Sequence, residues 1–297
     1  MAGPLGYRCR AGSPEHRTDP GNGRRTAGEE PRLSLALALV RDAGRLAVAG
    51  RMPADVRFKG PGDRITQMDL RIQSMIVAAI GQQFPGDGIL AEETEPTLAD
   101  REFVWIVDPL DGTNNYALGI PCFAISVAVF RGGEPYAGVV GDPNTGFCCW
   151  GLRGRGAFAT DRRLTLAPKS LDAASNISVR VPVQADLEPL VARWLRTHKL
   201  RWFGSVALHL AFAALGAIDL VLDHKAALWD VAAGATVLLE AGGHFATPTG
   251  HPVFPIDLAA YRGAPVPFLA GNPLAHATAV ASCRALLAGR PALPAPP

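Results

Sequence analysis

The chain has 297 residues, of which 48% are hydrophobic and 19% are charged, and its formal net charge is +2 at pH 7. This length accommodates one large domain or two of ordinary size, and a charge so near zero gives no electrostatic reason to expect a nucleic-acid partner. No apolar run reaches the length needed to cross a bilayer, so we expect no membrane partner.

The two ends of the chain differ in composition from the rest. Residues 1–30 contain six glycines, three prolines and five arginines, with almost no large apolar side chains. Such a segment cannot bury enough apolar surface to offset the entropy lost on ordering, so we predict a disordered tail over residues 1–30. The proline-rich residues 291–297 are predicted to form a second tail.

Residues 31–168 are predicted to form two helices followed by an antiparallel run of strands. Residues 33–49 fit both a strand and a helix pattern, and we choose helix because Leu and Ala favour it. Thr66 and Asp69 resemble a capping box, which predicts a helix over residues 70–84. The expected strands cover residues 89–91, 104–107, 124–130 and 135–140, with a turn over residues 131–134.

Residues 169–290 alternate between strand and helix patterns. Strands are expected at residues 177–181, 200–203 and 218–222. Helices are expected at residues 187–198, 206–215 and 230–240, and Asn272 with Pro273 begins a last one. This alternation is typical of an α/β arrangement, whereas the first half is typical of α+β.

Two aspartates follow a short apolar run in the first half. Residues 104–107 predict a buried strand that stops at Asp108, because Pro109 removes a ladder donor. Asp111, Gly112 and Thr113 then form a turn. Carboxylates three residues apart at a strand end can face one cleft, where they repel each other unless a cation such as Mg²⁺ cancels their charge.

The five cysteines show neither a disulfide framework nor the paired spacing of a zinc site. Cys148 and Cys149 are adjacent, and the other three are scattered. We therefore expect buried structural cysteines in a reducing compartment, and a cytoplasmic location.

Five segments in this order resemble the inositol monophosphatase family. They are the Lys59, Asp63, Thr66 and Asp69 pattern, the Glu92 and Glu93 pair, the run over residues 108–115, the Gly204 and Ser205 segment, and the run over residues 229–234. The resemblance covers roughly residues 31–290. It implies a layered α-β-α-β-α sandwich of the inositol monophosphatase and fructose-1,6-bisphosphatase type, with a cleft between residues 31–168 and 169–290. It also implies a homodimer.

The resemblance further implies a set of metal ligands. Glu92, Asp108 and the backbone carbonyl of Leu110 would hold one Mg²⁺, and Asp108, Asp111 and Asp230 would hold a second. Neighbours on a strand face opposite sides, so only one of Glu92 and Glu93 can point into the site, and the motif favours Glu92. Lys59 and Asp63 would lie on a mobile loop that carries a third, loosely held ion.

The catalytic and substrate-binding residues are also implied by resemblance. The Thr113 hydroxyl would hold the nucleophilic water together with Glu92, and Asp69 would orient that hydroxyl. Asp111, Gly112 and Thr113 would meet the substrate phosphate, since backbone N–H groups at a helix start favour anions.

The rest of the substrate would meet the second half of the chain. Ser205 and Asp223 would line the far wall of the cleft. Asp223 stands where many members have glutamate, and His209 stands where related sequences often have an acid. These two differences leave the role of His209 and inositol itself as the substrate open.

The implied function is a Mg²⁺-dependent phosphomonoesterase that hydrolyses a small polyol phosphate, such as inositol 1-phosphate, with water activated by two metal ions. Fructose 1,6-bisphosphate, histidinol phosphate and 3′-phosphoadenosine 5′-phosphate are alternative substrates within the family. A haloacid-dehalogenase-type phosphatase is a further alternative, but its acids lie two residues apart rather than three. A non-catalytic regulatory partner would be indicated by missing ligands, and none is missing.

Overall fold

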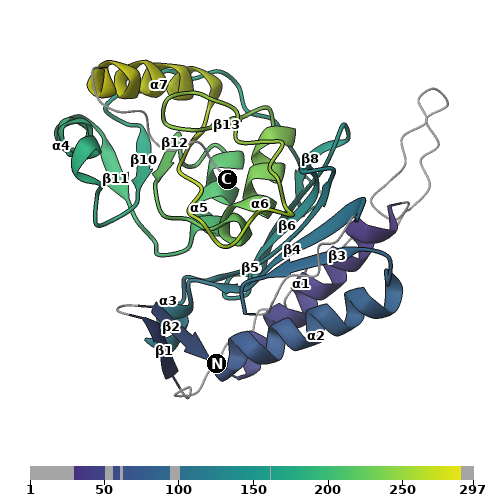
Figure 1. The fold of residues 1–297 in the computed structure, drawn as a ribbon. Helices are drawn as coiled ribbons and strands as arrows, with labels where there is room; N and C mark the ends of the chain where they lie inside the picture. Colours follow the sequence, from purple (N-terminus) through teal and green to yellow (C-terminus); the bar gives the residue numbers. More distant parts are fainter. Residues whose placement is uncertain (1–29, 51–55, 61–62, 94–100, 161, 289–297) are drawn as a thin grey trace.

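Three helical layers alternate with two sheets through the molecule (Figure 1). This computed structural model describes residues 30–50, 56–60, 63–93, 101–160 and 162–288. The two predicted tails lie outside these residues, apart from Glu30, which caps the first helix. Within the described segments, every helix is too short or too polar to cross a bilayer.

The larger sheet has seven strands in the order in which they occur in the chain. They are β3 (Gly88–Ala91), β4 (Phe103–Asp111), β5 (Ala124–Arg131), β6 (Glu134–Asp142), β7 (Phe147–Leu152), β8 (Gly156–Ala159) and β9 (Arg162–Leu164). β3 pairs parallel with β4, and the other neighbours are antiparallel. The predicted antiparallel run is therefore confirmed from β4 to β6, but its first strand, β3, pairs parallel, and β7, β8 and β9 were not predicted.

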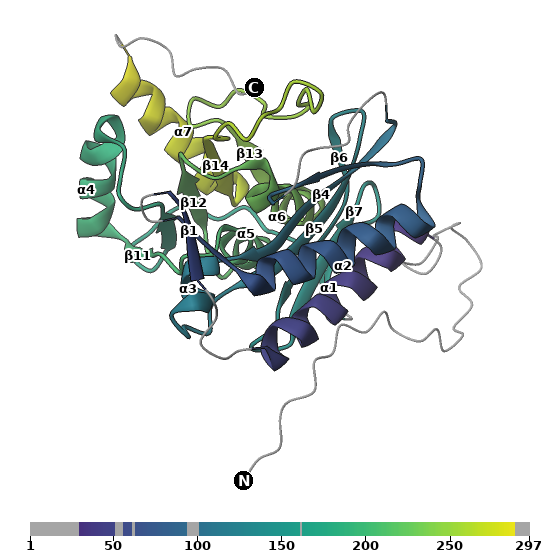
Figure 2. The same cartoon turned by 60° about the horizontal axis from the view of Figure 1, so that its bottom comes forward.

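Two helices cover one face of this sheet, as Figure 2 shows. They are α1 (Pro31–Ala49) and α2 (Gln67–Gln83). The helical interpretation of the ambiguous first segment is confirmed, with Leu33 and Val40 fully buried against the sheet. The predicted capping box also forms, because the Thr66 N–H donates to Asp69 Oδ2 at 2.8 Å while the Thr66 hydroxyl accepts from the first turn of α2.

The smaller sheet has five strands in the order β11-β10-β12-β14-β13. They are β10 (Asn176–Val179), β11 (Lys199–Arg201), β12 (Leu220–Asp223), β13 (His244–Ala246) and β14 (Phe268–Gly271). β10, β11 and β12 are parallel, and β14 runs antiparallel to both of its neighbours. The outer face carries α4 (Glu188–Thr197), which a 3₁₀ turn at Ala185–Leu187 precedes, and α7 (Pro273–Leu287).

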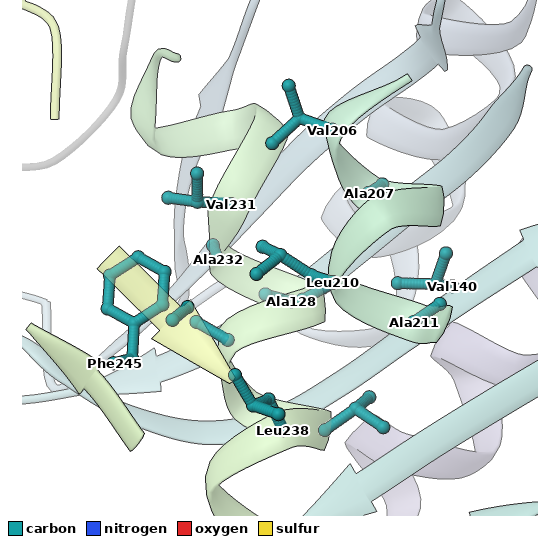
Figure 3. Close-up of a cluster of buried hydrophobic side chains, with 14 of the residues drawn as sticks. Ala128, Val140, Val206, Ala207, Leu210, Ala211, Val231, Ala232, Leu238 and Phe245 are labelled. Carbon is teal, nitrogen blue, oxygen red and sulfur yellow. The ribbon is translucent and has the colours of Figure 1, made fainter. Parts of the chain in front are cut away.

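Two helices, α5 (Val206–Ala214) and α6 (Leu228–Glu240), fill the space between the sheets. A Cβ on Gly234 would lie 2.5 Å from the Cβ of Leu210, so the two helices approach this closely because residue 234 is glycine. Figure 3 shows Leu210, Val231 and Ala232 in the cluster of buried hydrophobic side chains to which both helices contribute. This cluster joins residues of both predicted halves, so residues 31–168 and 169–290 share a core, and the boundary between them stays a prediction.

The structure corrects two local expectations. The backbone of Lys59 and Asp63 does not form a loop but belongs to a hairpin of β1 (Val56–Gly60) and β2 (Asp63–Thr66), in which Gly60 pairs with Asp63. Their side chains lie outside the described residues. The strand β4 does not stop at Asp108 but continues through Pro109 to Asp111, and the short helix α3 (Thr113–Ala117) follows.

Candidate metal centre and active site

A bulge in β4 brings Asp108 and Asp111 to the same side of the sheet. Residues three apart on a regular strand face opposite sides. Here Asp108 pairs with Ser126 and Asp111 with Ala124, so three steps along β4 match two steps along β5. The extra residue brings the side chains of Asp108 and Asp111 to the same face of the sheet. Pro109 is tolerated because it lies in the bulge, where no regular ladder hydrogen bond is lost.

The two aspartates meet a third from the middle layer. Asp108, Asp111 and Asp230 each offer a carboxylate oxygen, and these atoms all lie within 4.8 Å of one another. Asp230 lies in the first turn of α6, and Glu92, just beyond β3, lines the same cavity together with Leu110. The carboxylate oxygens of this cluster fit a hard divalent cation such as Mg²⁺.

The cluster is electrostatically costly without a cation. Burial raises the pKa of Asp108 well above its ordinary value, and the charges of Glu92, Asp111 and Asp230 raise it further. Burial and the same kind of repulsion raise the pKa of Asp230. Burial also raises the pKa of Asp111 to about 6, although hydrogen bonds from Ser205 and from backbone amides of α5 oppose the rise. Protons or cations must therefore compensate these charges at neutral pH.

Asp111 also connects the two halves of the molecule. Its Oδ2 accepts hydrogen bonds from the Ser205 hydroxyl and, at 2.7 Å, from the Ala207 N–H at the start of α5. Ser205 accepts in turn from the Leu208 N–H at 3.3 Å and caps the helix. Ser205 is completely buried and contacts Asp111 rather than the cavity that it was expected to line. Its neighbours Gly204 and Val206 line the cavity instead.

Thr113 and Asp69 lie together, as the resemblance implied. The Thr113 hydroxyl oxygen lies 2.8 Å from Asp69 Oδ1 and 2.9 Å from the carbonyl oxygen of Leu110. Asp69 is fully buried, and burial raises its pKa while hydrogen bonds from Thr66 and Thr113 oppose the rise. Gly112, at φ +96°, makes the turn from β4 into α3, a backbone conformation that favours glycine.

The cavity around these residues has a volume of about 350 Å³. Its walls consist of Arg64, Glu92, Asp108, Leu110, Asp111, Gly112, Thr113, Asn114, Arg180, Val181, Trp202, Gly204, Val206 and Asp230. A larger groove of about 750 Å³ between α4 and α7 has no acidic residue in its lining. The acidic cluster therefore lies in the smaller, polar cavity.

Asp223 does not reach this cavity. It is completely buried at the end of β12, and its Oδ1 accepts the N–H groups of Lys225 at 2.8 Å and Ala226 at 2.9 Å. Its Oδ2 lies 3.5 Å from Nη1 of Arg180. Arg180 thus stands between Asp223 and the cavity, which differs from the expectation that Asp223 meets substrate directly.

His209 packs behind the same wall. It is fully buried, and its Nε2 accepts the Phe203 N–H at 2.8 Å, which fixes the segment before α5. Its ring lies 4.8 Å from that of Trp202, measured between centroids. Burial, with a smaller contribution from Arg180, lowers the pKa of His209 to about 3, so the ring is neutral at physiological pH.

Sequence reasoning missed Arg64, Asn114, Arg180 and Trp202 as cavity residues. Two of them lie where the strand order of the smaller sheet places ligands. Arg180 and Trp202 directly follow β10 and β11, and ligands of parallel sheets bind beyond the carboxyl ends of the strands. Glu93, the neighbour of Glu92, is not in the cavity lining, and its backbone N–H donates to Gln73 Oε1 at 2.9 Å.

Known proteins match this chain over most of its length. A sequence model of the inositol monophosphatase family matches residues 29–285. An inositol-1-monophosphatase of Mesorhizobium japonicum is 37% identical over 198 residues, which are 63% of this chain and 73% of the relative. A fructose-1,6-bisphosphatase/inositol-1-monophosphatase of Thermotoga maritima is 33% identical over 214 residues, which are 71% of this chain and 83% of the relative.

A solved structure agrees with the sequence matches. The extragenic suppressor protein suhB of Bartonella henselae superposes with a TM-score of 0.77 at 29% identity, covering 88% of this chain and 100% of that chain. The layered architecture is therefore shared as well as the sequence. With the fold, the family match and the carboxylate cluster in agreement, this chain belongs to the inositol monophosphatase family.

Proposed function

We propose that the protein is a Mg²⁺-dependent phosphomonoesterase that hydrolyses a small polyol phosphate of the inositol 1-phosphate kind. The observation that carries the proposal is the cluster of Asp108, Asp111 and Asp230, with oxygens within 4.8 Å of one another. When bound, two divalent cations lower the pKa of a water molecule and neutralise charge on the phosphoryl oxygens. Glu92, the Leu110 carbonyl and the three aspartates are the residues that would hold them.

The Thr113 hydroxyl has one hydrogen and two acceptors within reach. If the hydrogen goes to Asp69, the hydroxyl oxygen can accept a hydrogen bond from the attacking water, and the Leu110 carbonyl oxygen remains for a cation. Thr66 fixes Asp69 through its N–H and its hydroxyl. We assign Thr113 to the positioning of water, Asp69 to the orientation of Thr113, and the N–H groups of Gly112 and Thr113 to the substrate phosphate.

The volume of the cavity, about 350 Å³, favours a small metabolite. Fructose 1,6-bisphosphate, histidinol phosphate and 3′-phosphoadenosine 5′-phosphate remain alternatives because the metal chemistry is the same for all of them. A homodimer stays a prediction of the family resemblance.

A phosphatase assay on inositol 1-phosphate and these alternatives, with and without Mg²⁺, tests the proposal. We expect hydrolysis that needs Mg²⁺ and vanishes in Asp108→Asn, which removes a charge shared by both proposed metal sites. Asp142→Asn is the matched control, since Asp142 is also buried but accepts hydrogen bonds within its own turn, from Asn144 and Thr145. Full activity in a chelator would contradict the metal mechanism.

Two other functions predict different results. A haloacid-dehalogenase-type enzyme would form an aspartyl-phosphate and would be trapped by beryllium fluoride on Asp108 or Asp111, whereas hydrolysis by water gives no such adduct. A non-catalytic regulatory partner would hydrolyse none of the substrates. The complete set of carboxylates in the cavity supports the enzyme.

A further inference from the structure

Arg180 occupies the point of the cavity wall where two parallel strands end. It directly follows β10, and its N–H donates to the Leu222 carbonyl at 2.9 Å, which continues the pairing with β12. This pairing places Arg180 beside Asp223, the last residue of β12. The carboxyl ends of parallel strands are where ligands of such sheets bind.

The side chain of Arg180 is held from two sides. Asp223 Oδ2 lies 3.5 Å from Nη1, and the Trp202 ring centroid lies 5.3 Å from Cζ. Asp223 is itself fixed by the backbone N–H groups of Lys225 and Ala226. An arginine has five N–H donors, and the ion pair to Asp223 is long, so this support orients the guanidinium without using its capacity to bind an anion.

Two arginines contribute to the wall of the acidic cavity. Glu92, Asp108, Asp111 and Asp230 supply four negative charges when ionised, and two divalent cations balance them. Arg64 and Arg180 then add positive charge to the cavity wall, and Asp223 offsets part of it from behind. Arg180 is thus a basic group in the wall of the cavity, placed where an oxyanion of the substrate can meet it.

Arg180 lies to one side of the carboxylate cluster. It lowers the pKa of Asp111, so it is within electrostatic reach of that residue. The main influences on the pKa of Asp108 are instead burial and the neighbouring acids Glu92, Asp111 and Asp230. Thr113 and Gly112, assigned to the transferring phosphoryl group, come from the other half of the molecule. Because Arg180 and this turn line the same cavity but come from different halves, a substrate with two anionic groups can present one to each.

We infer that Arg180 binds a second oxyanion on the substrate, a phosphate or a carboxylate, and thereby sets specificity. This inference rests on the proposed phosphatase function and narrows its substrates to phosphomonoesters with two anionic groups. Asp223 is a positioning residue that acts through Arg180, and Trp202 supplies the face against which the guanidinium packs.

Matched substrate pairs test the inference. Glycerol 2-phosphate and 2-phosphoglycerate differ by a carboxylate, and fructose 1-phosphate and fructose 1,6-bisphosphate differ by a phosphate. We expect kcat/KM to favour the member with two anionic groups by about 10- to 150-fold, the range for a hydrogen bond to a charged group. Arg180→Gln should abolish this preference, chiefly by raising KM for the member with two anionic groups. Arg180→Lys should keep only part of the preference, because lysine lacks the planar guanidinium that can donate two parallel hydrogen bonds to an oxyanion.

Arg201→Gln is the matched control. Arg201 ends β11 in the same sheet, but its side chain is exposed and its Nη1 donates to the Leu200 carbonyl at 2.9 Å. We expect this variant to keep the preference. Asp223→Asn, which retains an acceptor for the N–H groups of Lys225 and Ala226, should weaken the preference without removing it.

A binding measurement separates this inference from the proposed function. 3-Phosphonopropionate and propylphosphonate have P–C bonds that a phosphomonoesterase does not cleave, and they differ by a carboxylate. Calorimetric titration with Mg²⁺ should show tighter binding of 3-phosphonopropionate, and Arg180→Gln should remove the difference. If no ester is hydrolysed but this difference is present, the proposed function is wrong and the anion site stands.

Three outcomes would overturn the inference. Equal rates within both substrate pairs would exclude a second oxyanion site. If Arg180→Gln lowered kcat equally for both members of a pair, Arg180 would contact the reacting phosphoryl group instead. Equal binding of the two phosphonates, together with equal rates within the pairs, would leave Arg180 a structural role only.

Discussion

The carboxylate cluster should make the stability of the metal-free protein fall as pH rises. Burial raises the pKa of Asp111 from 3.8 to about 6, so the folded protein binds a proton more tightly here than the unfolded chain does. A raised pKa contributes stability below the unfolded value of about 3.9, and this contribution is lost as pH rises through the folded value. A shift of roughly two units is worth about 3 kcal/mol at about 1.4 kcal/mol per unit.

Urea unfolding in a chelator at pH 5, 6 and 7.5 measures the part of this loss that falls above pH 5, about half of it, and Asp111→Asn tests its source. We expect a lower free energy of unfolding at pH 7.5 than at pH 5, with a smaller fall in Asp111→Asn, which keeps an acceptor for Ser205 and Ala207. Mg²⁺ should reverse the fall in the wild type, and more strongly at pH 7.5 than at pH 5, because protons compete with the cation for the same oxygens.

Asp219→Asn is a control that should change the free energy of unfolding in the opposite direction to Asp111→Asn. Asp219 is also buried, but its carboxylate is paired with Lys169 Nζ at 2.7 Å and accepts the Asn176 N–H at 2.9 Å. Its loss should destabilise the metal-free protein at pH 7.5, whereas Asp111→Asn should stabilise it. If the metal-free wild type were equally stable at pH 5 and pH 7.5, or if Asp111→Asn destabilised it at pH 7.5, the argument from buried repulsion would be refuted.

Two further predictions concern stability. Gly204→Ala should lower the free energy of unfolding, measured in urea, by about 1–3 kcal/mol, because Gly204 has φ +76° and an added Cβ would lie 2.8 Å from Asn115 Nδ2. The control is Gly81→Ala in α2, where nothing lies within 4 Å of the added Cβ. This variant should raise the free energy of unfolding by about 0.5–1 kcal/mol. Deletion of residues 1–28 should leave the melting temperature unchanged by calorimetry, since their composition cannot bury a core, and a large fall would show that the segment packs on the rest of the chain.

The sequence predicted the residues of the cluster better than it predicted how they come together. Asp108, Asp111 and Asp230 lie in local motifs, and local motifs can be read from one chain. The bulge at Pro109 cannot, because a regular strand would place residues three apart on opposite faces, and only the pairing with β5 shows the extra residue. A proline at that position predicted a strand end for the same reason.

Arg180 and Trp202 were missed because their meeting depends on strand order. β10 lies between β11 and β12, so residues far apart in the chain end side by side, and single-sequence patterns do not contain this order. The turn residues Gly60, Pro61 and Gly62 predict a loop around Lys59 and Asp63, but the backbone of both residues pairs within a hairpin. The strands β7, β8 and β9 are short and carry glycine or arginine among their few residues, which weakens the periodic signal.

The geometry of the three aspartates explains how the fold tolerates them and prepares them for a cation. One oxygen of each carboxylate accepts a hydrogen bond from a backbone N–H. Asp108 Oδ1 accepts from Leu110 at 2.9 Å, Asp111 Oδ2 from Ala207 at 2.7 Å and Asp230 Oδ2 from Ala227 at 2.8 Å. These bonds fix each carboxylate before a cation arrives, so little side-chain entropy is lost on binding. Burial raises the pKa values of all three, and repulsion among the acids adds to the rise for Asp108 and Asp230, whereas these hydrogen bonds oppose it. The arrangement that would hold a cation is therefore the one that should lower metal-free stability at neutral pH, and a variant that relieves the repulsion should also weaken cation binding.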